Sequence, residues 1–272
     1  MTNHRSKKNL KNKAKINRIA LIPFAVLISA LILYWSLPLN STSEGGLFVK
    51  EVFDGDSILL LDGREIRYIG IDAPEISGKK PKEYYGKEAR DLNESLVLGK
   101  EVRLEFDVET KDGYNRTLAY VYIGDVMINL EMVEAGSALA VPYPPNLTHQ
   151  DELCGAMLRA RGEKKGIWED PDTWMITTDE ASRYIGLSKT VVGRVIYSDT
   201  VSVGTFLNFG EDFSRDFTVF IPKEYHKLFY DQSILDPAGK YLGRLVEITG
   251  TLWEKNGPSI TVRHPCQIYI RE

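Results

Sequence analysis

A short stretch from Arg67 to Glu75 places one guanidinium and two carboxylates around the end of an expected strand. Apolar residues alternate there at the strand period of two, and Pro74 must end the strand because it has no backbone N–H to donate. Arg67 and Ile71 share one parity, so we expect their side chains on one face and that of Asp72 on the other. A strand end with these groups can hold a cation, an anion and a water molecule together.

A second acidic cluster, Asp54-Gly55-Asp56-Ser57, stands between the first two expected strands. We expect Asp56 and Asp72 to meet, because both lie at strand ends of one antiparallel meander. Two carboxylates, a backbone carbonyl and water are ligands that calcium or magnesium prefers, and Gly55 would permit a positive φ at the bend. In the alternative interpretation, the aspartates only shape a turn.

A second arginine, Arg116, stands at the start of a later expected strand. Cleavage of a phosphodiester places extra negative charge on the phosphate oxygens, and arginine meets that charge with two parallel hydrogen bonds. Arg67 and Arg116, one metal ion and one carboxylate base would supply what this hydrolysis requires. The alternative for Arg116 is a solvated cation on a loop.

The elements that must position these groups follow from hydrophobic periodicity. Strands are expected over residues 47–54, 57–61, 65–71, 101–108 and 117–123, and helices over 84–98, 127–135 and 148–165. Thr148 to Asp151 has the form of a capping box at the start of the last helix. Five short strands with a helix between the third and the fourth predict an OB-type barrel with three helices over residues 47–170.

Residues 171–181 lack periodicity and are expected to link this barrel to a second β unit over residues 182–272. Strands are expected there over 190–198, 200–208, 217–221, 245–253 and 259–269, with a helix over 223–230 and a tight turn at 198–199. The pattern predicts a second, OB-like five-stranded barrel, so the fold class is α+β and mainly β. Tyr197, Phe209 and Phe213 would be barrel core or rim, or alternatively platforms for stacked bases.

The N-terminus has the pattern of a membrane anchor. Residues 1–18 carry seven Lys and Arg and no acid, and residues 19–39 are uncharged and mostly apolar. A run of this length can cross a bilayer, and the positive-inside rule puts residues 1–18 in the cytoplasm and the rest outside. Residues 40–46 read as a polar tether. The alternative is a cleaved signal peptide, which would leave a secreted protein.

The overall charge and the cysteines narrow the chemistry further. The net charge of −4 with +7 in residues 1–18 leaves −11 on the rest, which argues against a broad electrostatic grip on nucleic acid. The chain has only two cysteines, Cys154 and Cys266, and no zinc-type ligand spacing. We expect two separate core thiols, with a disulfide between them as the less favoured alternative.

Five motifs in this order and spacing resemble the staphylococcal nuclease (thermonuclease) family, over about residues 47–170. They are Asp54-Gly-Asp56, Arg67-x-x-Gly-Ile-Asp72-Ala-Pro-Glu75, Tyr114-Asn-Arg116-x-Leu-Ala-Tyr120, Asn146-x-Thr-His149 and Gly166-Ile-Trp168. The resemblance implies a calcium-dependent nuclease on an OB-fold, with DNA or RNA as substrate and 3′-phosphate ends as product.

The resemblance also implies a role for each matching residue. Calcium would be bound by the carboxylates of Asp56 and Asp72 and by the backbone carbonyl of Ala73. Glu75 would orient or deprotonate the attacking water. The scissile phosphate and its transition state would be gripped by the two arginines of the motifs, Arg67 and Arg116.

The substrate side differs in part from the family pattern. Tyr114 and Tyr143 would contact the nucleotide, while Val141 stands where the best-known member has a second tyrosine. Asn115 replaces the usual glycine before the second arginine, which would alter the loop. In the loop over residues 77–83, Lys79 and Lys80 would hold backbone phosphates, or else be solvated.

The leading hypothesis is therefore a membrane-anchored, calcium-dependent endonuclease that acts outside the cytoplasm. The alternative is a catalytically silent module that holds nucleic acid or protein. The segments around Leu207–Gly210, Gly257-Pro258 and His264-Pro265 resemble OB-fold nucleic-acid-binding modules appended to some such nucleases. No feature of the sequence indicates a protein partner.

Overall fold

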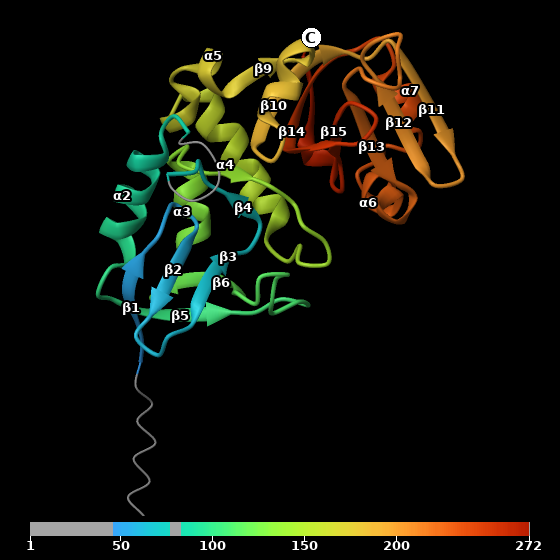
Figure 1. Ribbon diagram of the computed structural model, residues 1–272. Coiled ribbons are helices and arrows are strands. Elements are labelled where there is room, and N and C mark those ends of the chain that lie inside the picture. The colour runs from blue at the N-terminus through green and yellow to red at the C-terminus, as the bar shows by residue number, and fades with distance from the viewer. Residues whose placement is uncertain (1–45, 77–82, 272) are drawn as a thin grey trace, which may run out of the picture. The chain divides into compact units, whose positions relative to one another are not determined.

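The computed structural model describes residues 46–76 and 83–271, which belong to one compact unit (Figure 1). The expected cytoplasmic tail and membrane segment, residues 1–39, lie outside the described residues, as does most of the expected tether. Within the described part of the chain, no helix combines the length and apolar character needed to span a bilayer.

The N-terminal half contains the predicted barrel. Its strands are β1 (Leu47–Val52), β2 (Ser57–Leu60), β3 (Glu65–Tyr68), β5 (Glu101–Glu105) and β6 (Thr117–Ile123). They follow the order β3-β2-β1-β5-β6, and a parallel pairing of β3 with β6 closes the ring of five. Apolar side chains at alternate positions fill the interior, among them Ile58, Leu60 and Ile66, each fully buried. The short β7 (Val126–Met127) extends the sheet beyond β6.

Three helices cover the barrel, as predicted. They are α2 (Gly86–Val97), α3 (Ile128–Glu134) and α4 (Gln150–Gly162), followed by the short η1 (Gly166–Trp168). The capping box predicted at Thr148 is not formed: α4 begins after His149 without a side-chain cap, and the Thr148 backbone N–H donates to Asp107 at 3.0 Å. That bond ties the start of α4 to the barrel and uses the donor that the box would have engaged.

The strand expected over residues 65–71 is interrupted at Gly70, which has φ +78°. The chain turns there, and the short β4 (Ile71–Asp72) pairs instead with β8 (Leu139–Ala140). As a result the Arg67 and Asp72 side chains meet, with Nη2 and Oδ1 2.7 Å apart. The expectation that they lie on opposite faces is wrong, because strand parity does not continue through a left-handed residue.

Gly70→Ala is expected to destabilise the fold by about 2–4 kcal/mol, because it adds a strained φ and a steric overlap. A Cβ at Gly70 would lie 2.7 Å from Leu153 Cδ1. Gly63 is a matched control, since it has φ +89° and a Cβ added there would meet only open space. Urea unfolding of both variants separates the two contributions. Gly63→Ala should lower the free energy of unfolding only by the cost of placing alanine at a positive φ. Equal losses in the two variants would contradict the role of steric crowding at Gly70.

The C-terminal unit is a second β structure. Its strands are β9 (Met175–Thr177), β10 (Ser188–Arg194), β11 (Tyr197–Val201), β12 (Gly204–Asn208), β13 (Thr218–Pro222), β14 (Leu245–Glu254), β15 (Pro258–Thr261) and β16 (Ile268–Arg271). Its helices are α5 (Pro171–Trp174), η2 (Thr178–Tyr184), η3 (Lys223–Tyr225), α6 (His226–Asp231), α7 (Pro237–Tyr241) and η4 (Pro265–Gln267). The strand order is β11-β12-β13-β15-β14-β10-β9, with β16 paired to β14.

Several boundaries differ from expectation in this unit. The tight turn predicted at residues 198–199 is wrong, because β11 runs through it and the hairpin reverses between Val201 and Gly204. The strand predicted over 259–269 is two strands, β15 and β16, separated by η4 at Pro265. Residues 171–181, the expected linker, contain α5 and β9, which pairs in parallel with β10. Among the described strands, no pairing joins the two ends of the path, so a closed second barrel is not confirmed.

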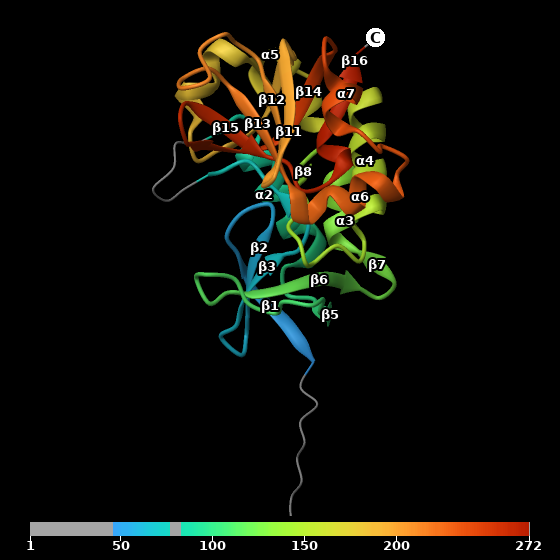
Figure 2. The ribbon, with the colours of Figure 1, turned by 90° about the vertical axis from the view of Figure 1, so that its right-hand side faces the viewer.

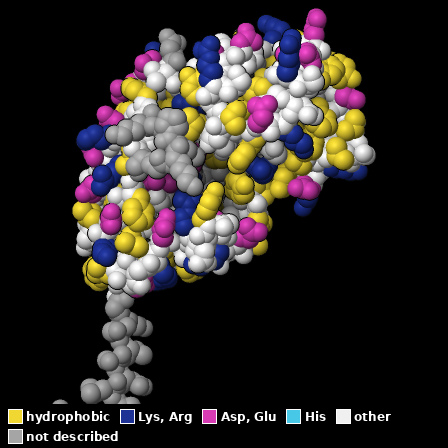
Figure 3. Space-filling view, viewed as in Figure 1, with side chains coloured by type: hydrophobic (Ala, Val, Ile, Leu, Met, Phe, Trp, Pro, Cys, Tyr) yellow, Lys and Arg dark blue, Asp and Glu magenta, His cyan; other side chains and the backbone are white. Residues whose placement is uncertain are grey.

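Buried and partly buried ion pairs join the two halves. Lys189 of β10 lies 2.9 Å from Glu83 at the beginning of the α2 segment, and both side chains are almost fully buried. Glu247 of β14 is paired with Arg161 of α4 and with Arg271 of β16. Figure 2 shows α4 alongside β16, and hydrophobic side chains gather in Figure 3 where the two halves meet.

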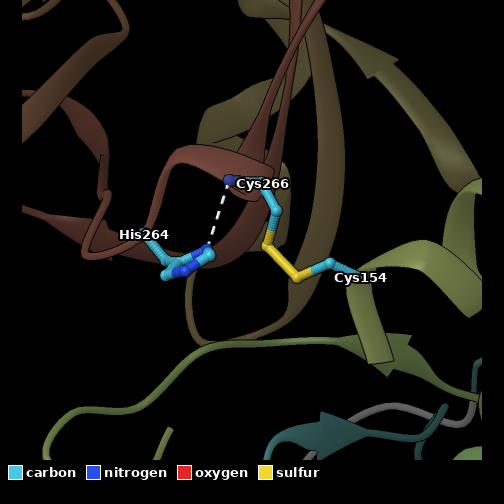
Figure 4. Close-up of side chains that lie close together, drawn as sticks. All are labelled: Cys154, His264 and Cys266. Atoms are coloured by element: carbon cyan, nitrogen blue, oxygen red, sulfur yellow. Dashed lines mark hydrogen bonds between the residues drawn. A yellow bond between two sulfur atoms is a disulfide. The ribbon is translucent and has the colours of Figure 1, made fainter. Parts of the chain in front are cut away.

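A disulfide between Cys154 of α4 and Cys266 of η4 is a further link between the halves (Figure 4). The expectation of two separate thiols is wrong, because α4 packs against the segment that carries η4 and brings residues 112 apart in sequence together. His264 lies beside the pair and accepts a hydrogen bond from the Cys266 N–H at 3.3 Å. Ligand atoms of these three residues lie within 4.8 Å of one another, but the sulfurs are bonded to each other.

Candidate active site

Part of the predicted site borders a cavity of about 460 Å³, but Asp56, Ala73 and Glu75 are not among the residues that line it. Three segments of the nuclease-like barrel contribute to it: the turn after β3, the loop before β6 and the loop after β8. Its lining includes Arg67, Asp72, Tyr114, Arg116, Val141 and Tyr143 from the barrel and Thr251 and Trp253 from β14. The predicted catalytic arginines and nucleotide-contacting tyrosines therefore share one cavity.

Asp56 and Asp72 come together as predicted, but the group between them is the guanidinium of Arg67, which was expected to bind the phosphate. Asp56 Oδ2 accepts a hydrogen bond from the Ala73 N–H at 2.6 Å and lies 3.1 Å from Arg67 Nη1. Asp72 Oδ1 accepts from Arg67 Nη2 at 2.7 Å. Asp54 has the other role: its Oδ1 accepts from the Asp56 N–H and from the Ser57 hydroxyl. The turn-shaping interpretation thus applies to Asp54, while Asp56 faces the strand end.

Several charged side chains lie close to the carboxylate of Asp56. Burial raises the pKa of Asp56 well above its usual range, the carboxylates of Asp54 and Asp72 raise it further, and Arg67 opposes them. A divalent cation would offset the same repulsion and desolvation, and two carboxylates beside a backbone carbonyl form a donor set for a hard cation. The carboxylates of Asp56 and Asp72 therefore have the donor chemistry that fits such an ion.

Gly55 is required for space rather than for its backbone angle. Its φ is not positive, contrary to the expectation, since Gly55 is absent from the left-handed glycines of the described chain. A Cβ at this position would lie 2.6 Å from the Ala73 Cβ and 3.0 Å from the Ala89 Cβ. The missing side chain lets the Asp56 turn approach Ala73 closely enough for their hydrogen bond.

The side chain of Arg67 is held by the turn that follows β3. Its Nη1 donates to the carbonyls of Tyr68 at 3.0 Å and Ile71 at 2.8 Å. Burial disfavours its charge, but Asp56 and Asp72 together raise the pKa of Arg67 above its ordinary value, with a smaller contribution from Glu75. The guanidinium is therefore permanently charged and fixed at the edge of the cavity.

Arg116 is positioned by its own loop. Asp112 accepts the Arg116 side chain at 2.7 Å and the backbone N–H groups of Tyr114 and Arg116 at 2.9 Å. Burial works against ionised Asp112, yet the bonds from Arg116 outweigh it and lower the pKa of Asp112 below its usual value. Asn115 has φ +68°, which asparagine tolerates, so the loop keeps a conformation that glycine would also adopt.

Asn146 ties the two loops that flank the cavity. Its amide donates to the Glu109 carbonyl and its oxygen accepts from the Glu109 N–H, each at 2.8 Å. This pair keeps the loop of Tyr143 beside the loop of Tyr114. Both rings project outward: Tyr114 is 86% exposed and Tyr143 is 59% exposed.

Glu75 lies three residues after Asp72. Its backbone exchanges two hydrogen bonds with Glu83: its N–H donates to Glu83 Oε2 at 3.2 Å, and its carbonyl accepts from the Glu83 N–H at 2.8 Å. Lys79 and Lys80, which were expected to hold phosphates, lie outside the described residues.

Comparison with known proteins covers the half of the chain that holds this site. The family model described as staphylococcal nuclease homologue matches residues 65–170. The thermonuclease of Staphylococcus hyicus is 39% identical over 139 residues, which are 50% of this chain and 82% of that protein. The chain belongs to the staphylococcal nuclease family. As a member it is a hydrolase of the nuclease class.

Other relatives of this nuclease carry the name endonuclease. An uncharacterized endonuclease of Escherichia coli O157:H7 is 34% identical over 155 residues, 53% of this chain and 90% of that protein. Endonuclease YncB of Bacillus subtilis (strain 168) is 34% identical over 128 residues, 44% of this chain and 60% of that protein. The family model ends at residue 170, so the C-terminal unit lies outside it.

Sequence reasoning missed the part of the cavity that the C-terminal unit supplies. Trp253 stands in a strand that was predicted, but no motif marks it as a site residue. The aromatic residues singled out instead lie elsewhere: Phe209 packs against the C-terminal core, while Tyr197 and Phe213 stack on each other with ring centroids 5.2 Å apart. None of these three borders the cavity.

Proposed function

We propose that this nuclease is a calcium-dependent endonuclease that cuts DNA or RNA and leaves 3′-phosphate ends. The observation that carries the proposal is that Arg67, Asp72 and Arg116 border one cavity together with two exposed tyrosines, Tyr114 and Tyr143. Two arginine side chains held in place can donate hydrogen bonds to the oxygens of a phosphodiester, and exposed aromatic rings can stack on the bases of the adjoining nucleotides.

In this proposal each residue has a role for which its chemistry is suited. Glu75 accepts a proton from the attacking water, whose oxygen forms the new bond to phosphorus while the bond to the 5′ oxygen breaks. Arg67 and Arg116 donate hydrogen bonds to the phosphate oxygens, where negative charge increases in the transition state. Asp112 keeps Arg116 directed along its loop, since it binds the Nε side of the guanidinium.

The proposed metal site is formed by Asp56, Asp72 and the backbone carbonyl of Ala73. A calcium ion bound there would supply positive charge to the phosphate and acidity to a coordinated water. The carboxylates come from two separate turns that Gly55 allows to pack closely, so the site depends on the folded barrel.

Removal of calcium is expected to abolish cleavage. The purified chain is incubated with single-stranded DNA, double-stranded DNA and RNA, with and without a calcium-selective chelator. Excess calcium should restore the activity, whereas magnesium at the same concentration should not, because it prefers a smaller, strictly octahedral shell. Cleavage that continues unchanged in chelator would contradict the proposal. Treatment of the products with a 3′-phosphatase tests for 3′-phosphate ends, since it should release inorganic phosphate from them.

We also propose that the enzyme acts outside the cytoplasm, anchored by residues 19–39. The seven cations that precede this run support it, and so does the Cys154–Cys266 disulfide, since such bonds persist in oxidising compartments. Protease added to intact cells should digest the C-terminal part of an anchored chain. A chain found only in the medium would instead indicate cleavage of a signal peptide, and a protected chain would contradict export.

A further inference from the structure

The C-terminal unit takes part in the catalytic cavity at two points. Thr251 and Trp253 of β14 border it together with Arg67 and Arg116. Arg263, which follows β15, lies over the Tyr143 ring, with its Cζ 4.7 Å from the ring centroid. A segment outside the matched family region thus forms one wall of the site.

Trp253 faces the cavity because of the alternation along β14. Its neighbour Leu252 is fully buried in the C-terminal core and pairs with Ile260, so the next side chain must point outward. Trp253 is 50% exposed, although tryptophan is among the side chains with most apolar surface to bury. The core therefore does not require the ring at this position, and the ring remains available to a ligand in the cavity.

Three exposed rings line the same cavity as the two arginines: Tyr114 and Tyr143 from the barrel and Trp253 from the C-terminal unit. Flat aromatic faces beside fixed cations are the combination that binds single-stranded nucleic acid, because bases stack on the rings while the cations meet the phosphates. A base already stacked within a duplex offers no free face to such a ring.

We propose that Trp253 stacks on an unpaired base of the strand held at Arg67 and Arg116, so that the C-terminal unit selects single-stranded DNA or RNA. This inference rests on the proposed function, because it takes the cavity to be the nucleic-acid site. Trp253 is a substrate-binding residue, and residues of the barrel carry out the chemical step.

Binding is tested with the full-length chain and a fluorescent, cleavage-resistant phosphorothioate oligothymidylate in the presence of calcium. Anisotropy should show that Trp253→Ala weakens binding about ten-fold, as expected for one stacked base, and that Trp253→Phe restores most of the loss. The same label on a blunt duplex should show little difference between the variants.

The matched control is Tyr230→Ala, which removes another half-exposed aromatic ring of the C-terminal unit, on α6 and outside the cavity. It should bind as the unaltered chain does. Because Trp253 is half-exposed, its alanine variant should also keep the unfolding temperature of the unaltered chain, which separates lost stacking from lost folding.

The inference and the proposed function fail in different ways. A chain that binds the oligothymidylate through Trp253 but cleaves no nucleic acid would refute the proposed function alone. A chain that cleaves, but whose Trp253→Ala variant binds single strands within about two-fold of the unaltered chain, would overturn the role of Trp253. Equal weakening on single strands and duplex would overturn the selection of unpaired bases.

Discussion

Glu75→Gln is expected to lower kcat about 100- to 10,000-fold while KM changes little. The amide keeps the size of the carboxylate but cannot accept a proton from water, and a positioned general base contributes a rate factor of that order. The backbone of Glu75 is held by Glu83 through two hydrogen bonds that the substitution does not touch. Initial rates on single-stranded DNA in saturating calcium measure both constants.

A matched control for this prediction is Glu109→Gln. Glu109 borders the cavity that Arg67 and Arg116 line, and it binds the Asn146 side chain through its own backbone atoms only. The variant therefore removes one negative charge and leaves the loops joined. It should retain most of the activity. If both variants lost activity equally, the effect would come from the local charge and not from proton transfer. Near-complete activity of Glu75→Gln would remove Glu75 from its proposed role.

Loss of the Cys154–Cys266 disulfide is expected to lower the free energy of unfolding by about 2–5 kcal/mol. The bond closes a loop of 112 residues, and a loop of that length loses much conformational entropy in the unfolded chain. The bond also joins α4 to η4, so its loss should loosen the contact between the C-terminal unit and the barrel. Urea unfolding of Cys154→Ser, Cys266→Ser and the double variant measures the loss.

Reduction of the unaltered chain is the complementary measurement. A thiol reductant should lower its stability to that of the double serine variant and should leave that variant unaffected. A single variant much less stable than the double would indicate that the remaining thiol is harmful in itself. Unfolding curves that coincide with and without reductant would contradict a stabilising disulfide.

Local patterns were sufficient to predict the barrel and the meeting of its charged groups. Alternating apolar residues located the strands, and the turn residues beside Asp56 and Asp72 placed both carboxylates at strand ends. These features depend on spacing within a few residues.

Features that depend on distant contacts escaped prediction. Gly70 lies within an apolar run that reads as one strand, and only the pairing of β4 with β8 requires the chain to turn there. The disulfide and the position of Trp253 depend on how the C-terminal unit packs against α4 and the cavity, which no local period encodes. The role of Gly55 is likewise set by a neighbour from another turn, Ala73.

The buried pair of Lys189 and Glu83 has a consequence for how the chain can evolve. Glu83 Oε1 is 2.9 Å from Lys189, while its Oε2 accepts the backbone N–H of Glu75. Removing one partner of a buried pair typically costs about 3–5 kcal/mol, whereas joint replacement by apolar residues is often tolerated. Lys189 and Glu83 are therefore expected to change together in descent, which would link a lysine outside the family domain to the backbone position of Glu75.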